Sequence, residues 1–274
     1  MSIPEIPIKV SVNSPIKGEL EIEKGRINVI MGRRYKTYLL KSIYSAITGR
    51  GWHIDVDIRV EHGPAYAHIR NALLEKHGKL SFNAVLFPED FVNDGRVLSL
   101  VDEFRKGKRY KYYGAEVPEA LERLYYDPED KMLYIENQGE RVPFSNASTS
   151  EKKIAIIATL AETGLLGDPE TTVLLFDEPN TSLHPQDELK LAYLLGLLAE
   201  KGYTVIVSTD DMDFLSMLSC INAVPKQLGQ RVFAKPVLSY TLNLIKDKEI
   251  LQYDIRSSAI PTYTGTLLDI YKNC

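Results

Sequence analysis

Residues 172–179 read Thr-Val-Leu-Leu-Phe-Asp-Glu-Pro and decide how the rest of the sequence is interpreted. A short apolar run between polar residues is typical of a strand that is buried on both faces. Asp177 and Glu178 follow at its carboxyl end, where open α/β sheets place their ligands. Because the chain turns there, one carboxylate can face a metal ion while the other faces a water molecule. The alternative is a buried strand that ends in two acids by chance.

The composition is that of a globular chain in a reducing compartment. The 274 residues suffice for one large α/β domain or two small ones, and 44% of them are apolar. The net charge of −4 gives no overall attraction to nucleic acid. Cys220 and Cys274 are too few for a disulfide framework. Because the sequence has no apolar run of transmembrane length and no visible signal peptide, we expect a cytoplasmic protein without a membrane span.

Hydrophobic periodicity predicts alternating strands and helices along the chain. The predicted strands cover 6–12, 16–23, 27–31, 52–61, 80–87 and 203–208, with hairpins at 132–144 and 235–256. The predicted helices cover 37–47, 65–77, 96–105, 117–125, 146–164 and 186–201, and a last helix ends the chain.

The segment between the strand at 27–31 and the helix at 37–47 has the position of a phosphate-binding loop. The known motif, G-x-x-x-x-G-K-[ST], uses glycines to turn backbone amides toward the phosphates and a lysine to add charge. Lys36 and Thr37 match it, but only three residues separate Gly32 from Lys36, and Tyr35 replaces the second glycine. Because tyrosine tolerates positive φ poorly, we expect the usual amide cradle not to form.

Two arginines in this loop offer another way to hold a phosphate. Arg33 and Arg34 can donate forked hydrogen bonds, and the helix N-terminus beside them favours anions. The sequence leaves two interpretations open: a shortened, arginine-assisted phosphate site, or a loop that only joins a strand to a helix.

Two further segments carry polar groups that bear on the same site. Ser148-Thr-Ser-Glu151-Lys152 opens the helix predicted at 146–164, and Ser148 with Glu151 also fits a capping box. Thr209 and Asp210 follow the strand predicted at 203–208.

Taken together, these motifs resemble the ABC class of P-loop ATPases, specifically its soluble SMC-like branch with the AAA-21 or overcoming-lysogenization-defect type. The resemblance is specific at 173–185, weaker at 146–153 and 203–215, and poor at 32–37. It implies an α/β fold, a three-layer P-loop NTPase (an ABC ATPase head) with an antiparallel β-subdomain and a helical lobe. It also implies a single domain over 1–274, with 52–145 as the β-subdomain and helical insertion.

The resemblance implies a role for each matching residue. Thr37 and Asp177 would hold Mg²⁺, and Glu178 would be the catalytic general base on water. Contacts to ATP would come from Gly32, Arg33, Arg34, Lys36, Thr37, Ser148 and Asp210. The chain departs from the family at Ser150, which replaces a glycine, and at Asp210, which replaces a histidine. An acid beside a triphosphate repels it unless the acid is protonated or metal-bound.

The implied function is ATP binding, with weak or partner-dependent hydrolysis at a head-to-tail interface in a homodimer or a heterodimer with another ATPase chain. The alternative is an inactive ABC-like subunit that serves as a protein or nucleic-acid interaction module. Residues 105–113 interleave five cations with tyrosines, a composition able to contact nucleic acid. The same composition also suits a solvated basic face.

Overall fold

A six-stranded sheet forms the centre of the molecule in the computed structural model, which describes residues 7–32, 34–50, 56–219, 239–246 and 248–256. Its strand order is β14-β13-β3-β12-β11-β7, and all neighbours except β13 and β14 run parallel. The strands are β3 (Ile27–Met31), β7 (Asn83–Phe87), β11 (Thr172–Asp177), β12 (Thr204–Ser208), β13 (Ser239–Lys246) and β14 (Glu249–Arg256).

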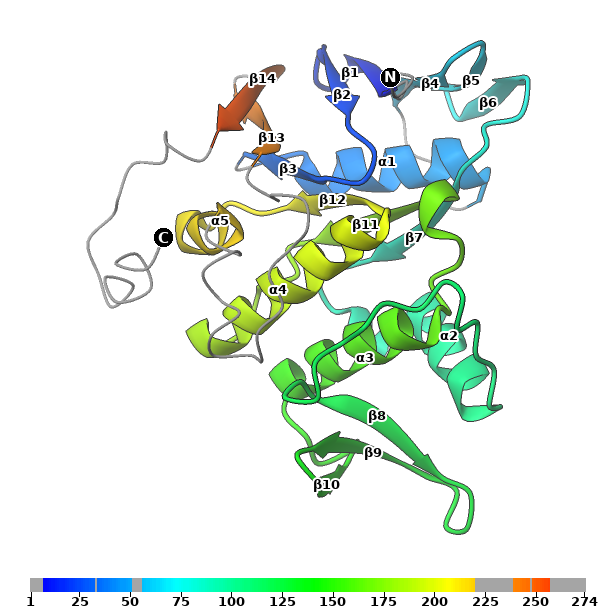
Figure 1. Cartoon of the computed structure of the whole chain (residues 1–274). Coiled ribbons are helices and arrows are strands. Elements are labelled where there is room, and N and C mark those ends of the chain that lie inside the picture. Colours follow the sequence, from blue (N-terminus) through cyan, green and yellow to red (C-terminus); the bar gives the residue numbers. More distant parts are fainter. Residues whose placement is uncertain (1–6, 33, 51–55, 220–238, 247, 257–274) are drawn as a thin grey trace, which may run out of the picture.

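Both faces of this sheet are covered, which explains the continuous apolar run of β11 (Figure 1). Leu174 and Phe176 belong to the core shared with α3 (Thr149–Thr163) and α4 (Pro185–Lys201). Val173 and Leu175 belong to a second core on the opposite face, shared with α1 (Lys36–Thr48). The prediction of a strand buried on both faces is therefore confirmed.

A second, antiparallel sheet lies beyond α1, so that α1 is held between two sheets (Figure 1). Its order is β2-β1-β4-β5-β6. The strands are β1 (Ile8–Ser14), β2 (Gly18–Ile22), β4 (Asp57–His62), β5 (Ala65–Arg70) and β6 (Leu73–His77). This sheet is the expected antiparallel β-subdomain.

The helical lobe lies on the other side of the core sheet and ends in a small third sheet (Figure 1). It contains α2 (Gly95–Arg105), α3 and the short helix η1 (Phe91–Asn93). A three-stranded sheet packs on α3 and consists of β8 (Arg123–Asp127), β9 (Met132–Asn137) and β10 (Glu140–Pro143). The short helix η2 (Pro169–Thr171) precedes β11, and α5 (Met212–Ser219) follows β12. The three-layer α/β architecture is confirmed, although β7, within 52–145, is a core strand.

The helix predicted over 65–77 is wrong, because this segment is the hairpin of β5 and β6. Asn71 and Ala72 form its turn, with φ of 50° and 59°. Two consecutive residues with positive φ form the turn type that suits the twist of a hairpin. Strand β5 also pairs with β4, so sheet formation prevails over the helix-like spacing of its apolar residues.

The helix predicted over 117–125 is also wrong. A turn closes from Leu121 N to the carbonyl oxygen of Pro118, and β8 begins at Arg123. The amide of Leu124 donates to the buried Thr159 hydroxyl of α3, so tertiary contacts replace helical hydrogen bonds. The last predicted helix, residues 235–238 of the predicted hairpin, Asp247 at its turn, and both cysteines lie outside the described residues. Across the residues that the structure does describe, every helix is too short or too polar to cross a membrane.

Candidate functional site

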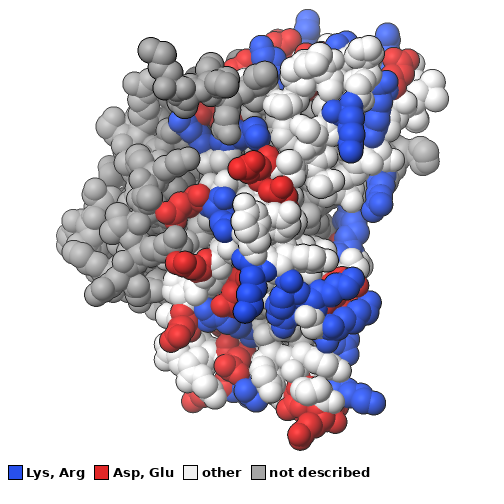
Figure 2. Space-filling view, turned by 45° about the vertical axis from the view of Figure 1, so that its right-hand side comes forward, with Lys and Arg blue, Asp and Glu red and all other residues white. Residues whose placement is uncertain are grey.

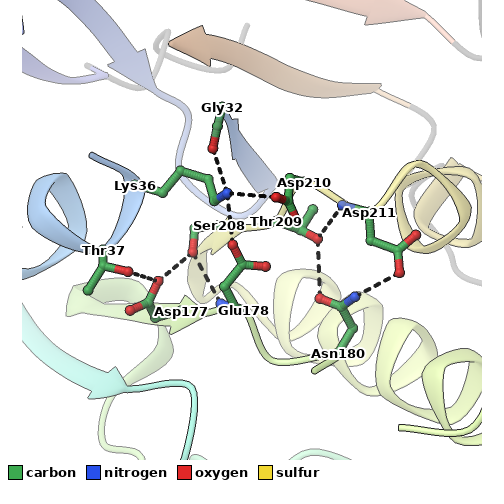
Figure 3. Close-up of polar contacts among 10 residues, drawn as sticks. All are labelled: Gly32, Lys36, Thr37, Asp177, Glu178, Asn180, Ser208, Thr209, Asp210 and Asp211. Carbon is green, nitrogen blue, oxygen red and sulfur yellow. Dashed lines mark hydrogen bonds and ion pairs between the residues drawn. The ribbon is translucent and has the colours of Figure 1, made fainter. Parts of the chain in front are cut away.

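The carboxyl ends of β3, β11 and β12 meet at one edge of the core sheet. Asp177 is paired in register with Ser208, and Ser208 with Ile30 one residue before the end of β3. Figure 3 shows that the side chains after these strands point toward one another and toward the first turn of α1. The sheet therefore assembles residues that are far apart in the sequence.

Asp177 is buried and held by two hydroxyl groups. Thr37 Oγ1 donates to Asp177 Oδ1 over 3.0 Å, and Ser208 Oγ donates to the same oxygen over 2.7 Å. Only 3% of Asp177 is exposed. A carboxylate beside two hydroxyl oxygens is the type of donor set that Mg²⁺ prefers. The residues present therefore fit the expected metal, and Thr37 and Asp177 are the side chains that would hold it.

Glu178 leaves the strand in a left-handed conformation, with φ of 46°. Such a conformation in a non-glycine residue costs roughly 1–2 kcal/mol. Its amide donates to both the carbonyl and the hydroxyl oxygens of Ser208, each over 3.1 Å, which stabilises the turn. The turn directs its carboxylate to Lys36, whose Nζ lies 2.8 Å from Oε1. Burial raises the pKa of Glu178 above its ordinary value, and the Lys36 ammonium opposes this shift only in part.

Lys36 is the centre of a small ionic cluster. Its Nζ donates to the carbonyl oxygen of Gly32 over 2.5 Å and lies 3.6 Å from Asp210 Oδ2. The Lys36 side chain is only 7% exposed, whereas that of Asp210 is 62% exposed. Two carboxylates are thus paired with Lys36, the lysine that the known motif uses to contact phosphate.

Tyr35 adopts the conformation that tyrosine tolerates poorly. Its φ is 71° and its ψ is −4°, which places it in the left-handed region at the N-cap of α1. The fold holds it there at a cost of about 1–3 kcal/mol, and the expectation that the usual amide cradle does not form stays a prediction. Gly32 also has a positive φ, of 144°.

A cavity of about 370 Å³ opens beside the ionic cluster. Its volume lies within the usual range for small-molecule sites. The exposed Arg34 lines it, while Arg33 lies outside the described residues. The other lining residues are Tyr35, Lys36, Thr37, Tyr38, Lys41 and Glu178.

A second hydrogen-bond network fixes the loops behind the carboxylates (Figure 3). Thr209 Oγ1 donates to Asn180 Oδ1 over 3.2 Å, and Asn180 Nδ2 donates to Asp211 Oδ2 over 3.1 Å. The Asp211 amide closes the ring by donating to Thr209 Oγ1 over 3.1 Å. Asn180 follows Glu178 closely in sequence, and Asp211 follows Asp210, so the network couples the backbones that carry the two acids.

Ser148 lies at the N-terminus of α3 and outside the Lys36 cluster. It is exposed and forms the expected capping box: its hydroxyl accepts from the Glu151 amide, and its own amide donates to Glu151 Oε2. The hydroxyl of Ser150 donates to the carbonyl oxygen of Ser182 over 3.4 Å. The start of α3 therefore contacts the loop after Glu178, while Ser148 faces solvent.

Two residues of the site were missed by the sequence analysis. Ser208 was not recognised, although a polar residue ending the strand next to β11 is a usable signal. Lys153 is 2% exposed, and its Nζ donates to the carbonyl oxygens of Pro179 over 3.2 Å and Thr181 over 2.8 Å. Its signal was a lysine placed among the apolar positions of α3.

Comparisons with known proteins agree with this geometry. Residues 52–216, more than half of the chain, match the family model AAA_21, described as "AAA domain, putative AbiEii toxin, Type IV TA system". The glutamate transport ATP-binding protein GluA of Corynebacterium glutamicum is 26% identical over 202 residues, which cover 72% of this chain and 74% of GluA.

Shorter and structural similarities point the same way. The energy-coupling factor transporter ATP-binding protein EcfA2 of Mesomycoplasma hyopneumoniae is 35% identical over 74 residues, but these cover only 27% of this chain and 22% of EcfA2. Among solved structures, an SMC head bound to the C-terminal winged-helix domain of ScpA is similar in fold, with a TM-score of 0.55 and 12% identity. That similarity covers 92% of this chain and 98% of the SMC head.

The family match covers the buried strand that ends in Asp177 and Glu178. Lys36 and Thr37 precede the matched residues, and the fold brings them to the two acids. Its fold is that of an ABC-class P-loop ATPase, as the similarity to the SMC head indicates, and the chain belongs to the AAA_21 family of AAA domains.

Proposed function

We propose that this chain binds ATP with Mg²⁺ at the edge where Lys36 and Thr37 meet Asp177 and Glu178. The observation that carries the proposal is the placement of Thr37 Oγ1 3.0 Å from Asp177 Oδ1, beside Lys36 at the start of α1. The N-terminus of α1 and the basic side chains that line the nearby cavity, Arg34, Lys36 and Lys41, supply positive potential for phosphates. Relatives named ATP-binding proteins support the same assignment.

Glu178 is proposed as the general base on the attacking water. In the structure its carboxylate pairs with Lys36 over 2.8 Å. A phosphate that recruits the Lys36 ammonium would compete with this pair and leave the Glu178 carboxylate available to accept a proton from water. Mg²⁺, when bound by Thr37 and Asp177, would supply charge stabilisation on the phosphate oxygens.

A complete site would require two chains. Ser148 is exposed at the start of α3 and lies outside the Lys36 cluster, so it is free to face the nucleotide of another ATPase head. The partner is a second copy of this chain or a related chain with an unaltered phosphate loop. The alternative, an inactive subunit, is favoured by Asp210, whose carboxylate lies 3.6 Å from the lysine that should meet phosphate.

Calorimetric titration of the pure chain with ATP, with and without Mg²⁺, tests the proposal. Thr37→Val should weaken binding in the presence of Mg²⁺ and have little effect without it. Thr48→Val is the matched control, because Thr48 ends the same helix, and its hydroxyl donates to the Tyr44 carbonyl oxygen and accepts from the Arg50 amide. Absence of heat at millimolar ATP with either cation condition would support the inactive alternative.

Mass measurement in solution tests the assembly. Nucleotide-dependent dimerisation of this chain alone supports a homodimer. A chain that stays monomeric with Mg-ATP, but is recovered from its native source bound to another ATPase, supports a heterodimer.

A further inference from the structure

We propose that the segment between α2 and β8 forms a second ligand site, which binds single-stranded nucleic acid independently of ATP. The segment crosses α3 at the lower side of the molecule (Figure 1). Together with Arg105 at the end of α2, it presents Lys106, Lys108, Arg109 and Lys111, all exposed, and residues 104 to 113 include no acid.

A cavity of about 660 Å³ lies beneath this segment. Four of the five cations line it, and its other walls come from β8, α3 and the end of α2. Glu162 is the one acid among the lining residues, and its carboxylate is paired with Arg123 over 3.0 Å. The lining residues are Phe104, Arg105, Lys106, Gly107, Arg109, Lys111, Leu124, Tyr125, Tyr126, Pro128, Thr159, Glu162 and Thr163.

Local ion pairs divide the cations into two groups. Arg105 pairs with Asp102 over 3.3 Å, and Lys106 and Lys108 both pair with Glu103. Arg109 instead donates to the carbonyl oxygens of Phe104 and Lys108, over 3.1 and 2.7 Å. The Arg109 guanidinium also lies over the Phe104 ring, 4.2 Å from its centroid, and its nearest acid, Glu162, is already paired with Arg123. Arg109 and its neighbour Lys111 are therefore the cations best placed to meet a phosphate.

Tyrosines stand beside these two cations. Tyr112 is 88% exposed and Tyr110 is 49% exposed. Large aromatic side chains this exposed, next to cations, are the combination with which proteins stack bases while holding the phosphate backbone. A duplex would hide its base faces from Tyr112, whereas a single strand exposes both its base faces and its phosphates. Single-stranded nucleic acid therefore fits both features.

The segment is held in place before any ligand arrives. The Tyr110 amide donates to the Thr163 carbonyl oxygen over 2.7 Å, and the Ala115 amide to that of Ala161 over 2.9 Å. Two glycines allow this close approach, because a Cβ on Gly114 would lie 2.3 Å from the Glu162 carbonyl oxygen and one on Gly164 2.2 Å from that of Tyr110. A fixed backbone lowers the entropy cost of binding.

The charge of the whole face agrees with this placement. In Figure 2 the molecule is turned so that the right-hand side of Figure 1 comes forward. Lys and Arg side chains gather across the lower half of the face seen in this view. Acidic side chains lie among them, in keeping with the ion pairs to Asp102 and Glu103. The net charge of −4 therefore conceals a locally basic surface.

Fluorescence anisotropy with the full chain tests the proposal, using a labelled oligothymidylate of about 15 nucleotides, without ATP, at low and moderate salt. We expect single strands to bind more tightly than a duplex of equal length. Tyr112→Ala should weaken binding about 5- to 100-fold through the loss of one stacked base. The double variant Arg109→Ala, Lys111→Ala should make the slope of log K against log salt shallower by about 1.4.

The matched control is Lys9→Ala with Arg26→Ala, which removes the same charge from exposed residues of another part of the molecule. It should leave affinity and slope unchanged, and thermal unfolding checks that every variant is folded. Three outcomes would overturn the proposal: equal losses in the control, binding to duplex as tight as to single strands, or binding unaffected by Tyr112→Ala. Since the assay contains no ATP, failure of this proposal leaves the ATP-site proposal unaffected.

Discussion

The two nucleotide-contacting regions expected from the sequence differ in how their polar groups are satisfied. At the edge of the core sheet, Asp177, Glu178 and Lys36 are largely buried. Lys36 pairs with Glu178, and Asp177 accepts from the hydroxyls of Thr37 and Ser208. At the start of α3, Ser148 is exposed, and its hydrogen bonds serve the helix cap. The polar groups at the sheet edge are thus bonded within one chain. At the start of α3, the Ser148 hydroxyl accepts one hydrogen bond within its cap and is otherwise exposed to solvent.

Because of this difference, substitutions in the two regions should have different consequences. Loss of a group at the sheet edge leaves a buried charge without its partner, which is costly. Loss of Ser148 affects only a cap and whatever a second chain places against it. Variants in the two regions can therefore separate chemistry from assembly.

The largest expected effect is at the sheet edge, with Glu178→Gln. If Glu178 is the general base, ATP turnover should fall by about 10²- to 10⁴-fold, while calorimetry still detects nucleotide. Glu170→Gln is the control, since Glu170 is an exposed acid just before the same strand. A Gln variant with the full rate would refute the assigned role.

The pH dependence of turnover gives a second test of Glu178. A base must be deprotonated, and burial raises the pKa of this carboxyl above its ordinary value. The acidic limb of the rate profile should therefore lie at higher pH than that of an ordinary glutamate, with the rate rising as pH rises. A rate profile whose acidic limb coincides with an unshifted glutamate would contradict this assignment.

How much of this site could be predicted from sequence depends on whether the signal was local. The strand ending in Asp177 and Glu178, and the capping box at Ser148, are contiguous patterns, and both were predicted. The pairing of Lys36 with Asp210 and the bonding of Ser208 to Asp177 join segments about 30 to 170 residues apart, so only the folded sheet reveals them. The hairpin at 65–77 is local, and it was missed because the pairing of β5 with β4 and β6 outweighs the spacing of apolar residues that suggested a helix.

The next effect concerns Glu188, a buried acid on α4 near the sheet edge. Burial, with help from Asp211 and Asp213, raises its pKa from 4.5 to about 7. The folded state then keeps a proton between these values that the unfolded state loses, so the contribution of this carboxyl to stability is most favourable at low pH and falls until about pH 7. Glu188→Gln should raise the free energy of unfolding by on the order of 2 kcal/mol at pH 8 and change it little at pH 4.

Urea unfolding at the two pH values measures this effect. Glu129→Gln is the control, since Glu129 lies exposed in the turn between β8 and β9. Equal gains for Glu188→Gln at both pH values would mean that the carboxyl is not the titrating group.

At the start of α3, two variants of Ser148 separate its cap from a contact with a partner. Ser148→Ala should lower the free energy of unfolding by about 1 kcal/mol, and Ser148→Gly by only a few tenths. Both variants lack the hydroxyl. If that hydroxyl contacts the phosphate of a nucleotide bound to a partner chain, both should weaken nucleotide-dependent dimerisation equally. Dimerisation that follows stability instead would assign Ser148 a capping role alone.

The smallest expected effect is at Asp210, where a substitution changes the charge of the sheet edge and little else. Asp210→Asn removes a carboxylate that lies 3.6 Å from Lys36 Nζ but is 62% exposed. Because solvent screens such a charge, ATP should bind only about 1.5- to 5-fold more tightly, and the gain should shrink at high salt. Asp213→Asn removes the same charge three residues later from an exposed position and should change affinity less. Calorimetry on both variants at two salt concentrations decides whether Asp210 hinders phosphate. If Asp210→Asn instead weakened ATP binding in the presence of Mg²⁺, the carboxylate would be contributing to the metal-nucleotide complex, and the inactive alternative would lose its main support.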